Sequence, residues 1–135
     1  MANPLHYRRL LWALGLALTA LVVALSLVPE PPGIPGDDNN WSGHLIAYGA
    51  MMGWFARLSP SARSRLAFGA AFCALGVAVE FAHRASGYRT FDVMDMLANA
   101  AGVCIGWIAS PPRAPHGIAV LDRALRRWLN PGSPA

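Results

Sequence analysis

The chain has 135 residues, which is enough for one domain with a single core. Hydrophobic residues make up 55% of it and charged residues only 13%, whereas an ordinary soluble domain has roughly 25% charged residues. The net charge is +4, but the basic residues, all arginine, lie at the ends of apolar segments instead of forming one patch. The composition therefore argues against an ordinary soluble domain and against nucleic-acid binding, and it favours a membrane protein.

Four apolar segments follow one another along the chain, over residues 10–28, 41–58, 65–83 and 92–110. The first carries no charge and has the length needed to cross a hydrocarbon core of about 30 Å. A cleavable signal peptide is the alternative for this segment, but the apolar run of a signal peptide is typically only about 7–15 residues long. We predict an all-α membrane protein in which residues 1–112 form a bundle of four transmembrane helices.

The arginine residues predict the orientation of this bundle. Nine of the eleven precede the first segment, lie between the second and third, or follow the fourth. Only Arg84 and Arg89 lie on the other side. Because cytoplasmic loops of membrane proteins carry an excess of positive charge, both chain termini are expected in the cytoplasm.

Residues 113–135 are predicted to form a cytoplasmic linker, an amphipathic helix and a tail. Ile118, Leu121, Leu125 and Trp128 recur at helical spacing, and arginine residues lie between them. Such a helix is expected to lie on the anionic inner surface of the membrane. A mostly disordered basic tail is the alternative.

Small residues indicate where the helices pack. Helices in lipid associate through close backbone contact, which small residues permit. Gly49 and Gly53 lie one turn apart in the second segment, and Gly102 and Gly106 lie one turn apart in the fourth. We predict that the second, third and fourth helices pack closely and that the first, rich in Leu and Val, faces lipid.

Polar side chains lie at the ends of three segments that are predicted to face away from the cytoplasm. His44 begins the second segment, Glu80 ends the third, and Asp95 lies about one turn into the fourth. A lone ionised carboxylate is strongly disfavoured at such a depth, so we expect these groups to meet and pair. The predicted polar site consists of His44, Glu80, Arg89, Asp92, Asp95 and Asn99, with Tyr48, His83 and Arg84 as further candidates.

Arg89 is the expected counter-ion in this site. Its guanidinium can hold the carboxylate of Asp92, Asp95 or Glu80 with two hydrogen bonds, and His44 or His83 could share a proton with another of these carboxylates. Asp92 also suits the start of a helix, where a carboxylate caps free N–H groups, and this alternative role stays open.

Glu80 and His83 form a Glu-x-x-His step, a pattern found in di-metal carboxylate proteins, and together with His44 and Asp95 they could hold a metal. Such sites need the step on two helices, and it occurs once in this chain. We therefore expect no metal and no cofactor.

The stretch RTFDVMDMLANAAG, residues 89–102, has the spacing Arg-x-Phe-Asp-x-x-Asp-x-x-x-Asn-x-x-Gly. Together with SLVP at 26–29 and with His44, Tyr48 and Glu80, this spacing resembles the VanZ-like family of small bacterial membrane proteins. The chain departs from the family at positions 40 and 41, where the family often has Asp and Lys, and at His83, where it usually has Gln.

The resemblance implies a multi-pass protein of the bacterial cytoplasmic membrane. The family's named member is linked to resistance to teicoplanin, a lipoglycopeptide antibiotic that acts at the cell envelope. The favoured hypothesis is a non-enzymatic protein whose outward polar site binds or shields a lipid-linked wall precursor or a lipidated drug, with membrane lipids as its other partners and no nucleic acid. One alternative is an intramembrane enzyme that acts on a lipid-linked wall substrate by acid–base chemistry. The other is a structural clamp of charges that holds the helix ends together.

Overall fold

The computed structural model describes residues 5–30, 35–36, 39–59, 61–111 and 117–129. These residues form five helices and no strands, so the prediction of an all-α protein is confirmed for this part of the chain. The helices are α1 (Arg8–Ser26), α2 (Trp41–Leu58), α3 (Ala62–Ser86), α4 (Val93–Ile108) and α5 (Gly117–Leu129). Parts of the loop predicted after the first helix and of the linker predicted before the last one, residues 31–34, 37–38 and 112–116, lie outside the described residues.

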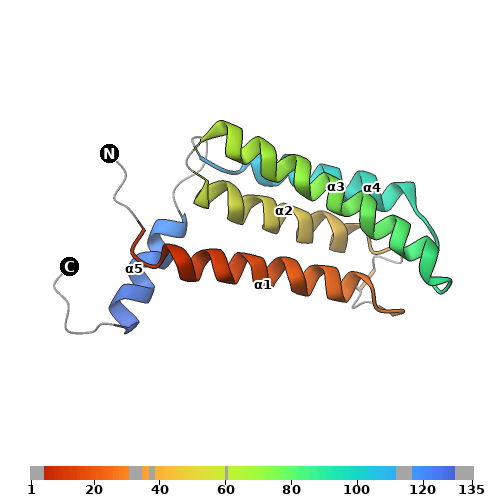
Figure 1. The fold of residues 1–135 in the computed structure, drawn as a ribbon, viewed down its shortest axis with the longest axis horizontal. Helices are drawn as coiled ribbons and strands as arrows, with labels where there is room; N and C mark the ends of the chain where they lie inside the picture. The colour runs from red at the N-terminus through yellow and green to blue at the C-terminus, as the bar shows by residue number, and fades with distance from the viewer. Residues whose placement is uncertain (1–4, 31–34, 37–38, 60, 112–116, 130–135) are drawn as a thin grey trace.

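The helices α1 to α4 lie side by side, and each runs in the direction opposite to the one before it (Figure 1). As a result, α2 and α4 run in the same direction. The loop between α3 and α4 lies where α1 ends and α2 begins, and we call this the loop end of the bundle (Figure 1). The last helix, α5, lies at the opposite end, which we call the α5 end.

The helix α2 is at the centre of the packing and contacts each of the other four helices. Tyr48, Met51, Met52 and Phe55 on α2 are at most 1% exposed. Three aromatic rings from α1 and α3 pack around Phe55, with ring centroids 4.9, 5.4 and 5.5 Å from its own. Aromatic pairs at these distances stabilise a core beyond the area that they bury.

The helices α2 and α4 approach each other at glycine residues. A Cβ atom on Gly102 would lie 3.0 Å from the backbone N of Gly49 and still closer to the carbonyl O of Leu45. A Cβ atom on Gly106 would lie 3.0 Å from the backbone N of Gly53. Backbone atoms within a helix cannot move aside as a flexible side chain can, so both positions of α4 require glycine for this close approach.

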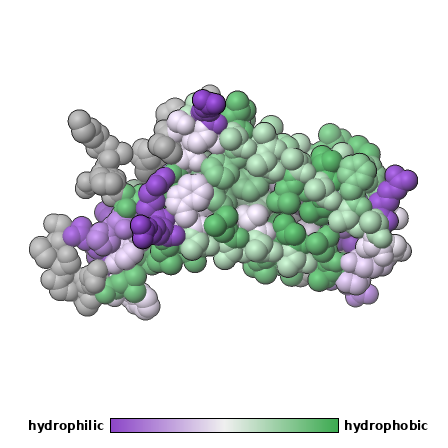
Figure 2. Space-filling view, viewed as in Figure 1, coloured by the Kyte–Doolittle hydropathy of each residue, from purple (hydrophilic) through white to green (hydrophobic). Residues whose placement is uncertain are grey.

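Two helices, α1 and α3, are long and apolar enough to cross a membrane by length and composition. The helix α4 is apolar but has only 16 residues, about 24 Å at 1.5 Å per residue. The helix α2 has 18 residues, but these include the polar side chains of His44 and Arg57 near its two ends. Figure 2 shows a hydrophobic band across the middle of the visible face, with hydrophilic residues toward both ends. The structure thus supports a helical protein with two candidate spans and does not confirm the four that were predicted.

The helix α5 is tied to the start of α1. The Asp122 carboxylate accepts hydrogen bonds from the backbone N–H groups of His6 and Tyr7, at 3.1 and 2.8 Å. On the same side of α5, Ile118 is buried in a small apolar cluster with Leu11 of α1. The helix predicted near the C-terminus is therefore present, and one side of it docks on the bundle.

Gly102→Ala tests the contact between α2 and α4. The new methyl group would overlap backbone atoms of α2, so the two helices must separate, and we expect the free energy of unfolding in detergent to fall by about 1–3 kcal/mol. Gly117→Ala is the matched control, because a Cβ atom at that position meets nothing within 4 Å. Equal stability of the two variants, measured by circular dichroism, would contradict the close contact.

Candidate functional site

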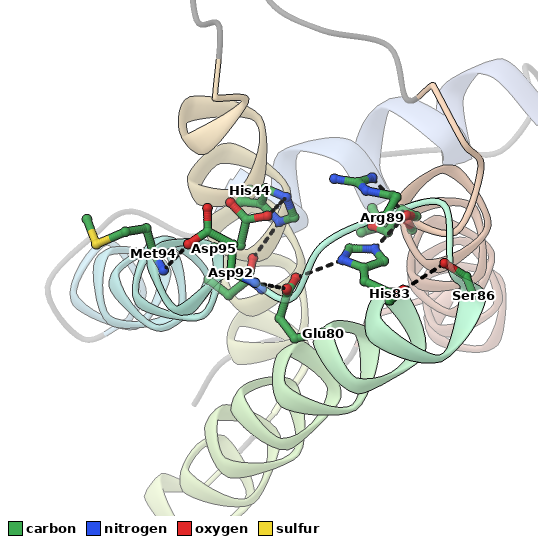
Figure 3. A network of polar contacts seen from close by, with 11 residues as sticks. His44, Glu80, His83, Ser86, Arg89, Asp92, Met94 and Asp95 are labelled. Carbon is green, nitrogen blue, oxygen red and sulfur yellow. Dashed lines mark hydrogen bonds and ion pairs between the residues drawn. The ribbon is translucent and has the colours of Figure 1, made fainter.

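Buried polar side chains of α2, α3 and α4 meet at the loop end of the bundle. His44 is 6% exposed, Asp95 is 5% exposed, and Glu80, His83 and Asn99 are at most 1% exposed. In Figure 3 the labelled side chains of His44, Glu80, His83 and Asp95 converge from the three helices. We call these five residues the polar cluster.

His44 of α2 is held between two side chains of α4. Its Nε2 lies 3.3 Å from Oδ2 of Asp95, and its Nδ1 lies 3.0 Å from Oδ1 of Asn99. Asp95 and Asn99 are four residues apart and share one face of α4, so a single imidazole reaches both. The glycine contacts set this register, because Gly102, three residues after Asn99 on α4, packs against the carbonyl O of Leu45, the residue that follows His44 on α2.

Glu80 and His83 lie one turn apart near the end of α3. Glu80 Oε2 accepts a hydrogen bond from the backbone N–H of Asp92 at 3.0 Å, and Glu80 Oε1 lies 3.0 Å from Nδ1 of His83. The other ring nitrogen of His83, Nε2, lies 2.8 Å from the carbonyl O of Ser26. Since a carbonyl oxygen can only accept, Nε2 carries a proton and donates it to this bond.

The end of α1 contributes two backbone carbonyl groups, which were not predicted as part of the site. The Ser26 carbonyl also accepts a hydrogen bond from Nη1 of Arg89 at 3.1 Å, and the Leu27 carbonyl accepts one from the hydroxyl of Tyr88 at 2.6 Å. The last carbonyl groups of a helix have no hydrogen-bond partner within the helix, so side chains at the loop end donate hydrogen bonds to them. The Ser-Leu-Val-Pro run, which ends a helix before a proline, marks these free carbonyl groups in the sequence.

Arg89 does not form the ion pair that was predicted for it. Within the described residues, the carboxylates of Glu80 and Asp95 lie against histidine side chains, and Arg89 donates to the Ser26 carbonyl instead. The expectation that Arg89 neutralises Asp92, Asp95 or Glu80 is therefore wrong. The physical reason is the course of the loop, which carries the guanidinium toward α1 and away from the carboxylates of α3 and α4 (Figure 3).

The other predicted site residues lie around the polar cluster. Asp92 is the N-cap of α4, and its Oδ1 accepts a hydrogen bond from the backbone N–H of Met94 at 2.7 Å. Tyr48 is buried one turn after His44, and its hydroxyl has no hydrogen-bond partner in the described part of the chain. Arg84 is exposed on α3 and lies outside the cluster. Asp92 therefore has the capping role that was considered for it.

A cavity of about 160 Å³ lies beside the polar cluster, between the end of α1 and the start of α2. Val22 and Leu25 of α1 and Ala47 of α2 form part of its apolar lining. Its polar lining includes His44 and Arg89, and the Arg89 side chain is half-buried there. The cavity thus combines an apolar wall with a positive charge at one side.

Three members of the polar cluster have the donor atoms of a metal site. One donor atom from each of Glu80, His83 and Asp95 lies within 4.8 Å of the other two, and all three residues are buried. Among the residues that the structure describes, this is the one group of its kind.

Comparisons of the chain with protein-family models, with curated proteins and with solved structures gave no match. The resemblance to the VanZ-like family therefore rests on the residue pattern alone. Any conclusion about function depends on the geometry of the site.

Substitutions at Asp92 test its role as the cap of α4. Asp92→Ala removes the acceptor for the Met94 N–H group, and we expect the free energy of unfolding to fall by about 1 kcal/mol. Asp92→Asn keeps an oxygen at that position, so its thermal unfolding in detergent should match that of the parent protein. An equal loss in both variants would show that the charge of Asp92 matters and that capping is not its main role.

Proposed function

We propose that this chain is a multi-pass protein of the bacterial cytoplasmic membrane, similar to the VanZ-like family, that binds an anionic amphiphile at the loop end of its bundle. The binding site is the cavity between α1 and α2, which Arg89 and His44 line, with Arg89 as its charged contact. The favoured ligand is a phosphate-bearing, lipid-linked wall precursor. A lipidated glycopeptide such as teicoplanin is a second candidate, which rests on the family resemblance.

The position of Arg89 is the observation that carries this proposal. Within the described residues Arg89 has no acidic partner, and its hydrogen bond to the Ser26 carbonyl uses one N–H group. A guanidinium has five N–H donors in a planar fork that matches the oxygen atoms of a phosphate. A phosphate group in the cavity would therefore bind the donors that this arrangement leaves available.

The apolar wall of the cavity favours an amphiphile over a free anion. Leu25 lines the cavity and is 39% exposed, and Leu21, one turn earlier on α1, is 55% exposed. An acyl or isoprenoid chain lying along α1 would cover this apolar surface, which is favourable in proportion to the area covered. The anionic head group would then reach Arg89.

The arrangement of the helices supports an outward-facing site. The helices α1 and α3 have the length and composition of membrane spans, and α2 and α4 pack alongside them. If all four cross the membrane, the loop end and the α5 end lie on opposite sides. The segments that meet at the α5 end carry the larger number of arginine residues, so the positive-inside rule places this end in the cytoplasm and the cavity outside.

The structural-clamp hypothesis has support of its own. His83 and Arg89 both donate to the Ser26 carbonyl and so join α3 and the following loop to α1. This role is compatible with ligand binding, because Arg89 has donors for both. Substitution of Arg89, with lipid content and thermal stability both measured, separates the two roles.

Thiol labelling tests the orientation. In a background carrying Cys73→Ala and Cys104→Ala, the substitution Arg84→Cys places an exposed thiol at the loop end and Arg63→Cys places one at the α5 end. We expect a membrane-impermeant maleimide to label the Arg84→Cys variant in intact cells and the Arg63→Cys variant only after lysis. The opposite labelling pattern would rule out an outward-facing site.

Arg89→Gln tests the binding site. We expect the full-length protein, purified from bacterial membranes, to retain a phosphate-bearing lipid that native mass spectrometry detects. Loss of a charge-assisted bond to phosphate should reduce this occupancy about tenfold or more. Arg84→Gln is the matched control, because it removes an exposed arginine from the same end of the bundle but outside the cavity.

Thermal unfolding of the same variants distinguishes binding from clamping. If Arg89→Gln lowers the melting temperature but leaves the lipid content unchanged, Arg89 is a clamp and the binding proposal is wrong. If lipid content falls while the Arg84→Gln variant keeps it, the binding proposal holds.

A further inference from the structure

We propose that the polar cluster binds one divalent transition-metal ion through Glu80, His83 and Asp95. This metal site is separate from the amphiphile site and does not depend on it, because none of these three residues lines the cavity that contains Arg89. It replaces the expectation of no metal. That expectation rejected a site of Glu80, His83, His44 and Asp95 because the step occurs only once, whereas the structure brings the donor atoms of Asp95 and of this single step together.

Each of the three side chains has one buried atom without a hydrogen-bond partner in the described part of the protein. These atoms are Oε1 of Glu80, Nδ1 of His83 and Oδ1 of Asp95. Buried polar atoms without a partner are rare in folded proteins, and they mark places where a water molecule or an ion binds. Here three of them belong to residues whose donor atoms lie within 4.8 Å of one another.

His83 presents a lone pair to Glu80. Because Nε2 donates its proton to the Ser26 carbonyl, the neutral imidazole has an unprotonated Nδ1. This Nδ1 lies 3.0 Å from Glu80 Oε1, yet the two atoms lack the alignment of a hydrogen bond. With His83 neutral, the two facing lone pairs repel each other, and a metal ion bound to both atoms would turn the repulsion into attraction.

The second polar atom of each donor group is already held by the protein. His83 Nε2 bonds to a backbone carbonyl at the end of α1, and Glu80 Oε2 accepts from the backbone N–H of the α4 cap residue. Asp95 Oδ2 lies 3.3 Å from Nε2 of His44. Histidine and carboxylate ligands of metals typically have such partners, which fix their orientation. The three donor groups are therefore oriented for one central ion.

The donor types and their spacing indicate which ion binds. One imidazole and two carboxylates suit Zn²⁺, Mn²⁺ or Fe²⁺. A tetrahedral Zn²⁺ site with bonds of about 2.0–2.2 Å places its ligand atoms roughly 3.3–3.6 Å apart, which small side-chain rotations can reach here. The charge of a divalent ion also equals that of two carboxylates, so a bound ion would neutralise Glu80 and Asp95 in the buried site. Three protein ligands leave a fourth position for water or another ligand.

Zinc titration of the full-length protein tests the proposal. The protein is purified in detergent, treated with a chelator, titrated with ZnCl₂ by calorimetry, and its metal content is measured by mass spectrometry. We expect one Zn²⁺ per chain, with affinity at least tenfold lower in Glu80→Gln, His83→Gln and Asp95→Asn. His6→Gln and Glu30→Gln are the matched controls, because they remove a histidine and a carboxylate outside the cluster and should leave the affinity unchanged.

Two further measurements test the metal site without substituting any of its three ligands. X-ray absorption of the zinc-loaded parent protein needs no variant to fold, and it should show nitrogen and oxygen ligands with no sulfur. Arg89→Gln should bind Zn²⁺ like the parent, so that loss of lipid and loss of zinc are separable. Absence of saturable 1:1 binding, or affinities that all three cluster variants leave unchanged, would overturn the metal site and leave shared protons as the link between these side chains.

Discussion

The backbone contact between α2 and α4 determines where the polar side chains of this protein meet. Gly102 and Gly106 allow the two parallel helices to approach so closely that backbone atoms of α2 occupy the space of a missing Cβ. This approach holds α2 and α4 in one register, in which His44 contacts both Asp95 and Asn99. The third helix then adds Glu80 and His83, and the polar cluster is complete.

The carbonyl groups at the end of α1 are the second feature that organises this region. The last carbonyl groups of a helix have no partner within it, and leaving them unpaired away from water is costly. The Ser26 carbonyl receives N–H groups from both His83 and Arg89. The bond from His83 also fixes which ring nitrogen carries the proton, so the same contact that ends α1 prepares the other nitrogen of His83 to bind a metal ion.

The sequence predicted the helices well because apolar length and helix-breaking residues are local features. The second segment was predicted over residues 41–58, and α2 has these same limits. The bounds of α4 differ from the predicted 92–110 because Asp92 caps the helix from outside and the last turn ends at Ile108. Whether α2 and α4 span a membrane could not be settled by length, since packing against neighbours lets a shorter or more polar helix lie within a bundle.

The partners of the site residues were less predictable than their positions. Helices of alternating direction bring the ends of α2, α3 and α4 together, so the meeting of His44, Glu80 and Asp95 follows from the order of the segments. The partner of Arg89 depends on the course of the loop between α3 and α4, which no periodic pattern encodes. His83 was only a further candidate in the sequence, yet its two ring nitrogens connect α1 to Glu80 at the centre of the cluster.

A double-mutant cycle between His44 and Asp95 tests most directly whether the α2–α4 contact brings the cluster together. The free energies of unfolding of the parent protein, His44→Ala, Asp95→Ala and the double variant are measured in detergent under identical conditions. Side chains that meet in a buried site should show a coupling energy of roughly 1–3 kcal/mol. A coupling energy below about 0.5 kcal/mol would mean that the two side chains do not interact, which would contradict the register of α2 and α4 on which the polar cluster depends.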